Sequence, residues 1–306
     1  MTLKDVWTLL KQAGQEWLND NATRLSAAVA FYTILSITPL FLIAVAIAGA
    51  VFGEQAATGA LTDQLRGMLG DAGGEVVRTA LAHASKPGAG VFATVVGVAT
   101  LLFGASGVFG ELQSALNTVW NVKPKPGRGI WATVRDRFLS FGMVLVVGFL
   151  LLVSLIASTM LTALGGYLEG LAPGVPTMVN LASFVVSFLI VTLLFALVYK
   201  FLPDAKVAWR DVWLGALVTA ALFTLGKYLI SLYLGTAGVA SPFGAAGSLV
   251  AFVVWVYYSG LIVFFGAELT QVTAAHAGRR IEPTDNAVFA DADELPQKAS
   301  RAAQPA

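Results

Sequence analysis

The sequence contains no cysteine and only two histidines among its 306 residues. Without cysteine, disulfide bonds and thiolate chemistry are excluded, and the redox compartment is left open. Metal-dependent hydrolases hold their metal and activate water with clustered histidines and carboxylates. Neither His83 nor His276 has a second histidine or an acidic cluster beside it. We therefore expect no catalytic residues, no metal site and no cofactor, and neither an enzyme nor a nucleic-acid-binding protein.

Charged residues are also scarce, at 12% of the chain, against roughly 25% in an ordinary soluble domain. Four long runs have no charge at all and a fifth has only Lys227; they are 25–53, 87–110, 138–168, 170–199 and 212–267. A helix needs about 20 apolar residues to cross a bilayer, and the fifth run has room for two crossings around the Gly-rich stretch 235–247. The sequence therefore predicts an all-α, polytopic membrane protein, a bundle of six transmembrane helices over about residues 25–53, 89–120, 138–166, 179–200, 211–234 and 247–272.

Basic residues are distributed unevenly among the predicted loops. Fifteen Lys and Arg residues lie before the first span, in 121–137, in 200–210 and after residue 272, whereas the other loops hold three. The positive-inside rule places the richer loops, and with them both termini, in the cytoplasm. We therefore expect a multi-pass protein of the inner (cytoplasmic) membrane, with a membrane domain over 25–272 and an external helical loop at 54–88.

The two ends of the chain differ in character. Residues 1–24 predict a cytoplasmic amphipathic helix with an apolar face made of Leu3, Trp7, Leu10, Gly14 and Trp17. Such a helix either lies along the membrane interface or packs on the underside of the bundle, and the sequence favours neither. The composition of residues 273–306 predicts a disordered cytoplasmic tail. The basic loop 121–137 either contacts anionic lipid headgroups or, as we favour, simply fixes the topology.

Five positions inside the predicted spans are candidates for a substrate pathway. Tyr32 and Ser36 lie just before Pro39, which removes a backbone donor and kinks the first span. Glu111 in the second span and Lys227 in the fifth place charges at membrane depth, where they are costly and often functional. Structural alternatives are a static kink at Pro39, close packing through the glycines beside Glu111, and snorkelling of Lys227 to the outer surface.

A further candidate, Glu268 in "FFGAELT", lies inside the last predicted span. The preceding charge in the sequence is Lys227, 41 positions earlier. Arg24 opens the first span at the same predicted membrane level, so we favour an ion pair of Arg24 and Glu268 that fixes two helix ends. The alternative is a cytoplasmic gate or a protonatable coupling site at Glu268.

The sequence resembles the YihY/BrkB family of bacterial inner-membrane proteins in three stretches: "RLSAAVAFYTILSITPLFLI" at 24–43, "ALNTVWNV" at 115–122 and "FGAAGSLVAFVVWVYYSGLIVFFGAELTQV" at 243–272. The likeness covers about residues 5–275. The recurrent features of the family match here at Ala30, Phe31, Tyr32, Ser36, Pro39, Asn117, Gly247, Ser248, Trp255, Tyr257, Tyr258, Gly266, Ala267 and Glu268. The resemblance implies six helices but no settled activity. Members have carried the label ribonuclease BN, and others are linked to serum resistance or envelope-lipid transport.

Two classes of function fit these features. A kinked first helix, a small-residue second helix and few intramembrane charges favour a transporter or flippase-like protein that handles an envelope lipid or a small anionic solute. The alternative is a non-transporting envelope scaffold. A continuous cavity lined by Tyr32, Ser36, Glu111 and Lys227 would favour transport, whereas a bundle packed solid by Leu, Val and Phe would favour the scaffold. Membrane lipids are the expected partners, and the sequence leaves the oligomeric state open.

Overall fold

The structure is a computed structural model, and it describes residues 3–36, 59, 107–126, 142, 175–236 and 247–290. Several of the predicted features lie outside these residues. Pro39, the predicted span 138–166 apart from residue 142, and the end of the tail at 291–306 lie outside the described residues. Of the predicted external loop at 54–88, only Gly59 is described.

The described chain is mostly helical. α1 runs over Leu3–Asn19, α6 over Val175–Phe201, α7 over Trp209–Thr236 and α9 over Gly247–His276, and residues 22–36 and 107–119 are also helical. Within the described residues, three stretches are long and apolar enough to cross a membrane: Leu181–Phe201, Trp209–Leu229 and Phe252–His276. They coincide with the last three predicted spans. A helix suits these apolar runs because it satisfies every interior backbone group within one segment.

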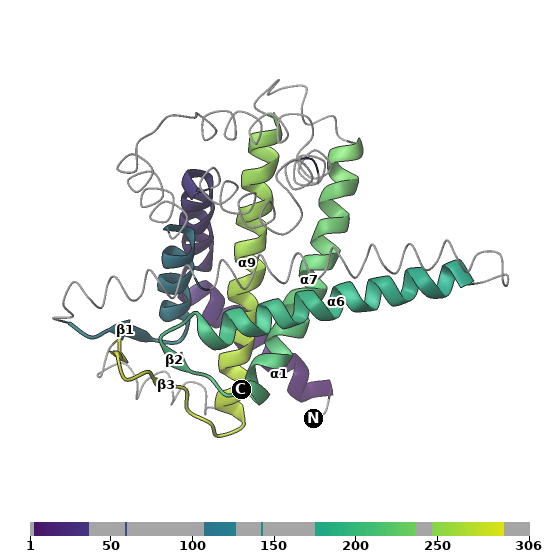
Figure 1. The fold of residues 1–306 in the computed structure, drawn as a ribbon. Helices are drawn as coiled ribbons and strands as arrows, with labels where there is room; N and C mark the ends of the chain where they lie inside the picture. The colour runs from purple at the N-terminus through teal and green to yellow at the C-terminus, as the bar shows by residue number, and fades with distance from the viewer. Residues whose placement is uncertain are drawn as a thin grey trace, which may run out of the picture.

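The arrangement of α6 differs from the predicted bundle. α7 and α9 rise from the same end of the molecule, whereas α6 lies across both of them and its N-terminal half projects beyond (Figure 1). Exposed apolar side chains cover this half, among them Met178, Leu181 and Phe184. A helix that is apolar on all sides presents no preferred face to a neighbour. The sequence of α6 therefore could not indicate how the helix packs.

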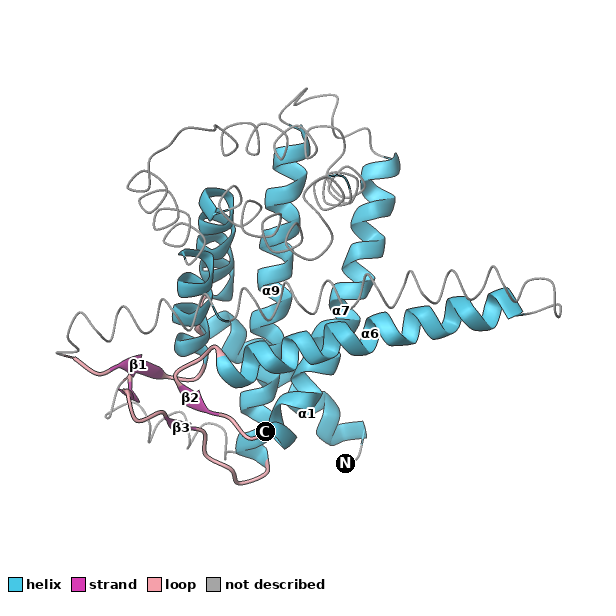
Figure 2. Ribbon diagram, in the orientation of Figure 1, coloured by secondary structure: helices cyan, strands magenta, loops and turns pink. Residues whose placement is uncertain are grey.

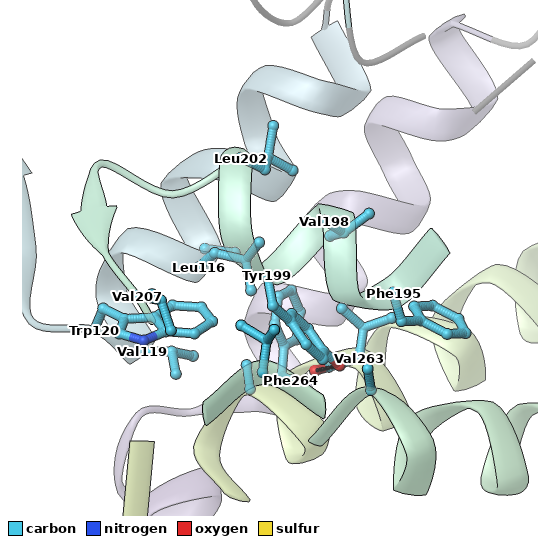
Figure 3. Packing of buried hydrophobic residues seen from close by; sticks show 14 of the residues in the cluster. Leu116, Val119, Trp120, Phe195, Val198, Tyr199, Leu202, Val207, Val263 and Phe264 are labelled. Carbon is cyan, nitrogen blue, oxygen red and sulfur yellow. Dashed lines mark hydrogen bonds between the residues drawn. The ribbon is translucent and has the colours of Figure 1, made fainter. Parts of the chain in front are cut away.

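One hydrophobic cluster joins the helices where they meet. Its buried members come from helix 107–119, α6, α7 and α9, and include Leu116, Val119, Tyr199, Ala216 and Phe264. Tyr199 lies among these side chains (Figure 3), and its ring is 6.2 Å from that of Trp120, centroid to centroid. In this region the bundle is packed solid by apolar side chains.

Short strands gather beside this end of the bundle, where Figure 2 shows them in magenta. β1 (Val122–Pro124) pairs antiparallel with β4 (Ala287–Phe289), and β2 (Ala205–Lys206) pairs antiparallel with β3 (Glu282–Pro283). We call residues 113–126, 200–211 and 277–290 together the loop junction. The sequence predicts neither these strands nor the order of the tail, so the expectation of a disordered segment from residue 273 is wrong over 273–290.

The tail is ordered because α9 ends in a specific cap. The helix continues four residues beyond the predicted end, to His276. Gly278 then adopts a left-handed conformation with φ of 69°, the amide of Gly278 donates to the carbonyl of Ala275, and the amide of Arg279 donates to that of Ala274. These two bonds form a Schellman cap. The cap turns the chain so that the Arg279 guanidinium donates to the Asp211 carboxylate in the first turn of α7.

The N-terminal helix α1 packs against α9. Leu9 and Ala13 are buried in a small cluster with Leu269 of α9. Two residues before the end of α1, the indole Nε1 of Trp17 donates to the carbonyl of Leu261 over 3.0 Å. α1 therefore runs antiparallel to the last turns of α9, as an element on the end of the bundle.

Candidate functional site

The predicted first and second spans meet at a polar seam. A Cβ added to Gly107 would lie 3.2 Å from the hydroxyl of Ser36 and 3.7 Å from the ring of Tyr32. The missing side chain at Gly107 is therefore what allows helix 22–36 to approach helix 107–119 here. Ser36 is buried and Tyr32 is partly exposed. The structure thus brings together two of the predicted pathway residues, and the glycine opposite them is one of three, Gly104, Gly107 and Gly110, that are spaced three residues apart in the sequence.

The remaining pathway candidates are not all at this seam. Glu111 lies one turn after Gly107 on the same helix and is half-buried. Lys227 is exposed on α7, and within the described residues no ion pair joins it to Glu111. The single cavity lined by all four polar candidates stays a prediction.

The same helix 22–36 packs closely on α9. Ser26 is fully buried, its hydroxyl donates to the carbonyl of Ala22 over 2.7 Å, and a Cβ added to Gly260 would lie 3.0 Å from the Cβ of Ser26. Because Ser26 satisfies its hydroxyl within its own helix, it presents a small surface to α9. Ser26 and Gly260 therefore set the spacing of these two helices.

A buried polar cluster joins α6, α7 and α9. The hydroxyl of Tyr199 lies 2.7 Å from that of Thr219 and donates to the carbonyl of Val263 over 2.8 Å. Every buried hydroxyl here is therefore hydrogen-bonded. A Cβ added to Gly266 would overlap the Thr219 hydroxyl, and one added to Gly215 would overlap the carbonyl of Gly266. α7 and α9 thus touch backbone to backbone.

Glu268 lies half a turn beyond this crossing and is completely buried. It is two turns from the end of α9 at His276, one turn deeper than the sequence predicts. Arg24 stands in the first turn of helix 22–36 and is exposed. The two residues thus differ in environment, and their ion pair stays a prediction.

The aromatic positions of the family motif form part of the α7–α9 packing. The ring of Trp255 lies 5.0 Å from that of Phe223 on α7 and 6.1 Å from that of Tyr258, centroid to centroid. A Cβ added to Gly226 would overlap the ring of Tyr258. Tyr257 is half-buried, and Gly247 and Ser248 form the first turn of α9. The rings that the structure places here serve helix packing.

Asn117, another motif residue, has a clear partner. Its Nδ2 donates to the Asp204 carboxylate over 2.9 Å, and the amide of Asp204 donates to its Oδ1 over 2.8 Å. Gln113 also donates to the Asp204 carboxylate, over 3.4 Å, and the carbonyl of Asp204 accepts from the amide of Thr284. Asp204, in the turn between α6 and α7, therefore connects helix 107–119, this turn and the tail.

Basic side chains of the loop junction bind the tail. Lys123 donates to the carbonyl of Ala290, and Lys125 donates to that of Asp285 over 2.6 Å. The Lys206 ammonium lies 2.8 Å from the Asp285 carboxylate. This hydrogen bond raises the pKa of Lys206 and lowers that of Asp285. The two lysines of the basic loop 121–137 that the structure describes thus bind protein carbonyls, and lipid contact by this loop stays a prediction.

Sequence reasoning missed Tyr199, Asp204, Asp211 and Gly215. The signals were weak: Asp204 follows a proline in an ordinary turn, and Tyr199 lies in an apolar run. Among the described residues, no group of three or more His, Asp or Glu side chains is placed to hold a metal ion.

Comparison with known proteins gives matches along most of the chain. A UPF0761 membrane protein of Halorhodospira halophila is 29% identical over 264 residues, which are 85% of this chain and 56% of the relative. One of Mannheimia succiniciproducens is 29% identical over 260 residues, 82% of this chain and 84% of the relative. One of Pseudomonas aeruginosa is 34% identical over 180 residues, 58% of this chain and 41% of the relative.

The chain spans little more than half the length of the first relatives, those of Halorhodospira halophila, Verminephrobacter eiseniae and Ralstonia nicotianae, at 56%, 57% and 56%. No solved structure matches it. The family described as virulence factor BrkB matches residues 13–288. This match covers nearly all of the described helices, and the chain therefore belongs to the virulence factor BrkB family of membrane proteins.

Proposed function

We propose that this membrane protein is a transporter or flippase-like protein of the bacterial inner membrane, handling an envelope lipid or a small anionic solute. The observation that supports the proposal is the seam of Tyr32, Ser36 and Gly107, with Glu111 one turn along. Polar and ionisable groups between membrane helices are costly and mark pathways. A seam closed by a glycine contact leaves the two helices able to move against each other at this point, because Gly107 has no side chain to interlock with Ser36 and Tyr32.

The proposed topology has six transmembrane helices, an amphipathic α1 and both termini in the cytoplasm. It rests on the fifteen-to-three bias of basic residues. The loop junction gathers several of these residues, including Lys123, Lys206 and Arg279. Next to it, exposed aromatic side chains stand at the ends of two candidate spans: Phe201, Trp209 and Trp213. Tryptophan favours either membrane–water interface, and the basic residues beside it favour the cytoplasmic one, so this end of the bundle suits the cytoplasmic surface.

In this proposal the seam residues bind and orient the substrate. The hydroxyls of Tyr32 and Ser36 offer hydrogen bonds to a phosphate or another anion, and Pro39 bends the same helix just beyond them. Glu111 would bind a cationic portion of a lipid headgroup or exchange a proton. We assign Glu268 a structural role as the favoured alternative, with a gate or coupling role as the other. No step of this function requires a metal, and we propose no enzymatic activity.

The second candidate function, a non-transporting scaffold, is favoured by one specific observation. The hydrophobic cluster around Tyr199 fills the described part of the bundle near the loop junction with Leu, Val, Phe and Trp side chains. A solid core of this kind suits a protein that only presents surfaces to partners.

A reconstitution experiment distinguishes the transporter from the scaffold. The full chain is placed in liposomes, and inward movement of fluorescent phosphatidylglycerol is followed by dithionite quenching, with chloride and phosphate uptake measured in parallel. We expect at least one probe to move, and Ser36→Ala and Glu111→Gln to slow it about tenfold or more. The control is Ser114→Ala, an exposed serine on the same helix as Glu111, which should leave the rate unchanged. If no probe moves faster than in empty liposomes, the scaffold is supported.

A further inference from the structure

The charges of α1 are segregated between two faces of the helix. Leu9 and Ala13 mark the face that packs on α9. With about 100° of turn per residue, both acidic residues of α1, Asp5 and Glu16, lie within about 40° of Leu9 and are half-buried. The acidic side chains are thus turned toward the protein.

The opposite face of α1 combines basic and large apolar side chains. Trp7 and Leu18 are 70% and 66% exposed, and Lys4 and Lys11 are also exposed. All four lie within about 60° of one another around the helix. We call them the outer face of α1. Exposed apolar side chains beside lysines suit a membrane surface, because a lysine can lay its stem along apolar surroundings and keep its ammonium group at the headgroups.

The packing of α1 also orders these residues by depth. Leu9 contacts Leu269 and the Trp17 indole reaches Leu261, so the later residues of α1 lie farther from the end of α9. Because α9 contains the candidate span Phe252–His276, Lys4 lies nearest the water, Trp7 and Lys11 follow, and Leu18 lies deepest. Leu18 is thus placed to reach the acyl chains, and the other three residues are placed at the level of the headgroups, where tryptophan is also favoured.

We propose that the outer face of α1 binds the anionic lipid headgroups of the membrane, with Lys4 and Lys11 on the phosphates, Trp7 beside them among the headgroups and Leu18 inserted between the chains. The proposal does not depend on transport. It also differs from lipid binding by the loop 121–137, because the lysines described there bind the tail. In this proposal both possibilities for the N-terminal helix hold: one face packs on the bundle, and the other binds lipid.

The absence of cysteine allows a clean test with single labels. Leu18→Cys and, as matched control, Asn19→Cys are each labelled with an environment-sensitive fluorophore. Asn19 is the next residue, exposed, and about 100° around the helix. Each full-length protein is placed in nanodiscs of phosphatidylcholine with and without phosphatidylglycerol. Quenching is measured with a lipid-attached spin label and with neutral acrylamide in the water.

We expect lipid quenching at position 18 to exceed that at position 19 by about threefold or more, and to increase with phosphatidylglycerol. Combining Lys4→Gln with Lys11→Gln should abolish the increase without changing thermal stability in detergent, since both side chains are exposed. Equal acrylamide quenching at both positions would overturn the proposal. So would lipid quenching at position 18 that is the same with and without phosphatidylglycerol in the unsubstituted protein, a measurement that does not depend on how the lysine variants fold.

Discussion

α7 and α9 cross closely at Gly266. Adding a single methyl group at this glycine and at others should therefore change the stability of the protein according to the space around each one. A Cβ at Gly266 would overlap the Thr219 hydroxyl and approach that of Tyr199 to 2.6 Å. To make room, α7 and α9 must separate, or the hydrogen bond between these two hydroxyls must break. Overpacking costs about 1–3 kcal/mol, and a lost buried hydrogen bond costs a further ~1 kcal/mol. We therefore expect Gly266→Ala to lower the free energy of unfolding by about 2–4 kcal/mol.

Two other glycines provide the comparison. A Cβ at Gly14 in α1 would meet nothing within 4 Å, so Gly14→Ala should stabilise the helix by up to about 1 kcal/mol through its higher helix propensity. At Gly107 the new atom would lie 3.2 Å from the Ser36 hydroxyl, which is tight but adjustable. We expect Gly107→Ala to fall between the other two, within about 1 kcal/mol of the unsubstituted protein.

Equilibrium unfolding in mixed detergent micelles measures all three variants under one condition. A double substitution supplies the decisive control, because Thr219→Ala removes the atom that the new methyl group meets first. We expect the double variant with Gly266→Ala to be more stable than the sum of the two single effects implies. If Gly266→Ala is as stable as Gly14→Ala, or if the double variant is simply additive, α7 and α9 do not touch as described.

Three further predictions concern the loop junction and the buried glutamate. Asn117→Ala should destabilise the protein by about 1.5–3 kcal/mol, because it removes one hydrogen bond to the Asp204 carboxylate and one from the Asp204 amide. The exposed control Thr118→Ala should cost almost nothing, and equal unfolding curves would contradict this. Asp285 has a lowered pKa, so its ion pair is formed above the ordinary value of 3.8 and lost as the pH falls below it. Amide exchange of 282–290 should thus be faster in Asp285→Asn than in the unsubstituted protein at pH 7. The ratio of the two rates should approach one only below pH 3.8, and a ratio independent of pH would refute the pair. For the Arg24–Glu268 pair, Glu268→Gln should weaken the protein modestly and Arg24→Ala more, and the reciprocal charge swap should recover part of the loss, whereas additive effects without rescue would exclude the pair.

The sequence predicts the apolar helices well because the signal is local. Runs without charge decide where α6, α7 and α9 lie, and the observed ends differ from the predicted ones by only a few residues. A close helix approach near Gly107 was also predictable, since Gly104, Gly107 and Gly110 stand at helical spacing and small residues favour such an approach, but the spacing does not distinguish among the three.

The loop junction was not predictable, because its contacts join residues far apart in the chain. Asn117 and Asp204 are separated by 87 positions, and nothing in either segment alone indicates the other. The tail has the composition of a disordered segment, yet its strands pair with β1 and β2 after the Gly278 cap directs it there. The way in which α6 crosses the other helices was not predictable either. This helix is apolar on all sides, so its sequence indicates no particular packing face.

These contacts bear on where a transporter of this architecture could open. Opening at the loop junction would break both hydrogen bonds between Asn117 and Asp204 and the ion pair of Arg279 with Asp211. At about 1.5–3 kcal/mol for the bond to the carboxylate and about 0.5–1.5 kcal/mol for the neutral one, the first two bonds alone would hold the open state to about three molecules in a hundred or fewer. At the seam of Ser36 and Gly107 the two helices approach each other through a glycine, which has no side chain to interlock with the facing helix. If the protein is a transporter, we therefore expect movement at the seam about a fixed loop junction, with Glu268 near the fixed end governing stability rather than rate.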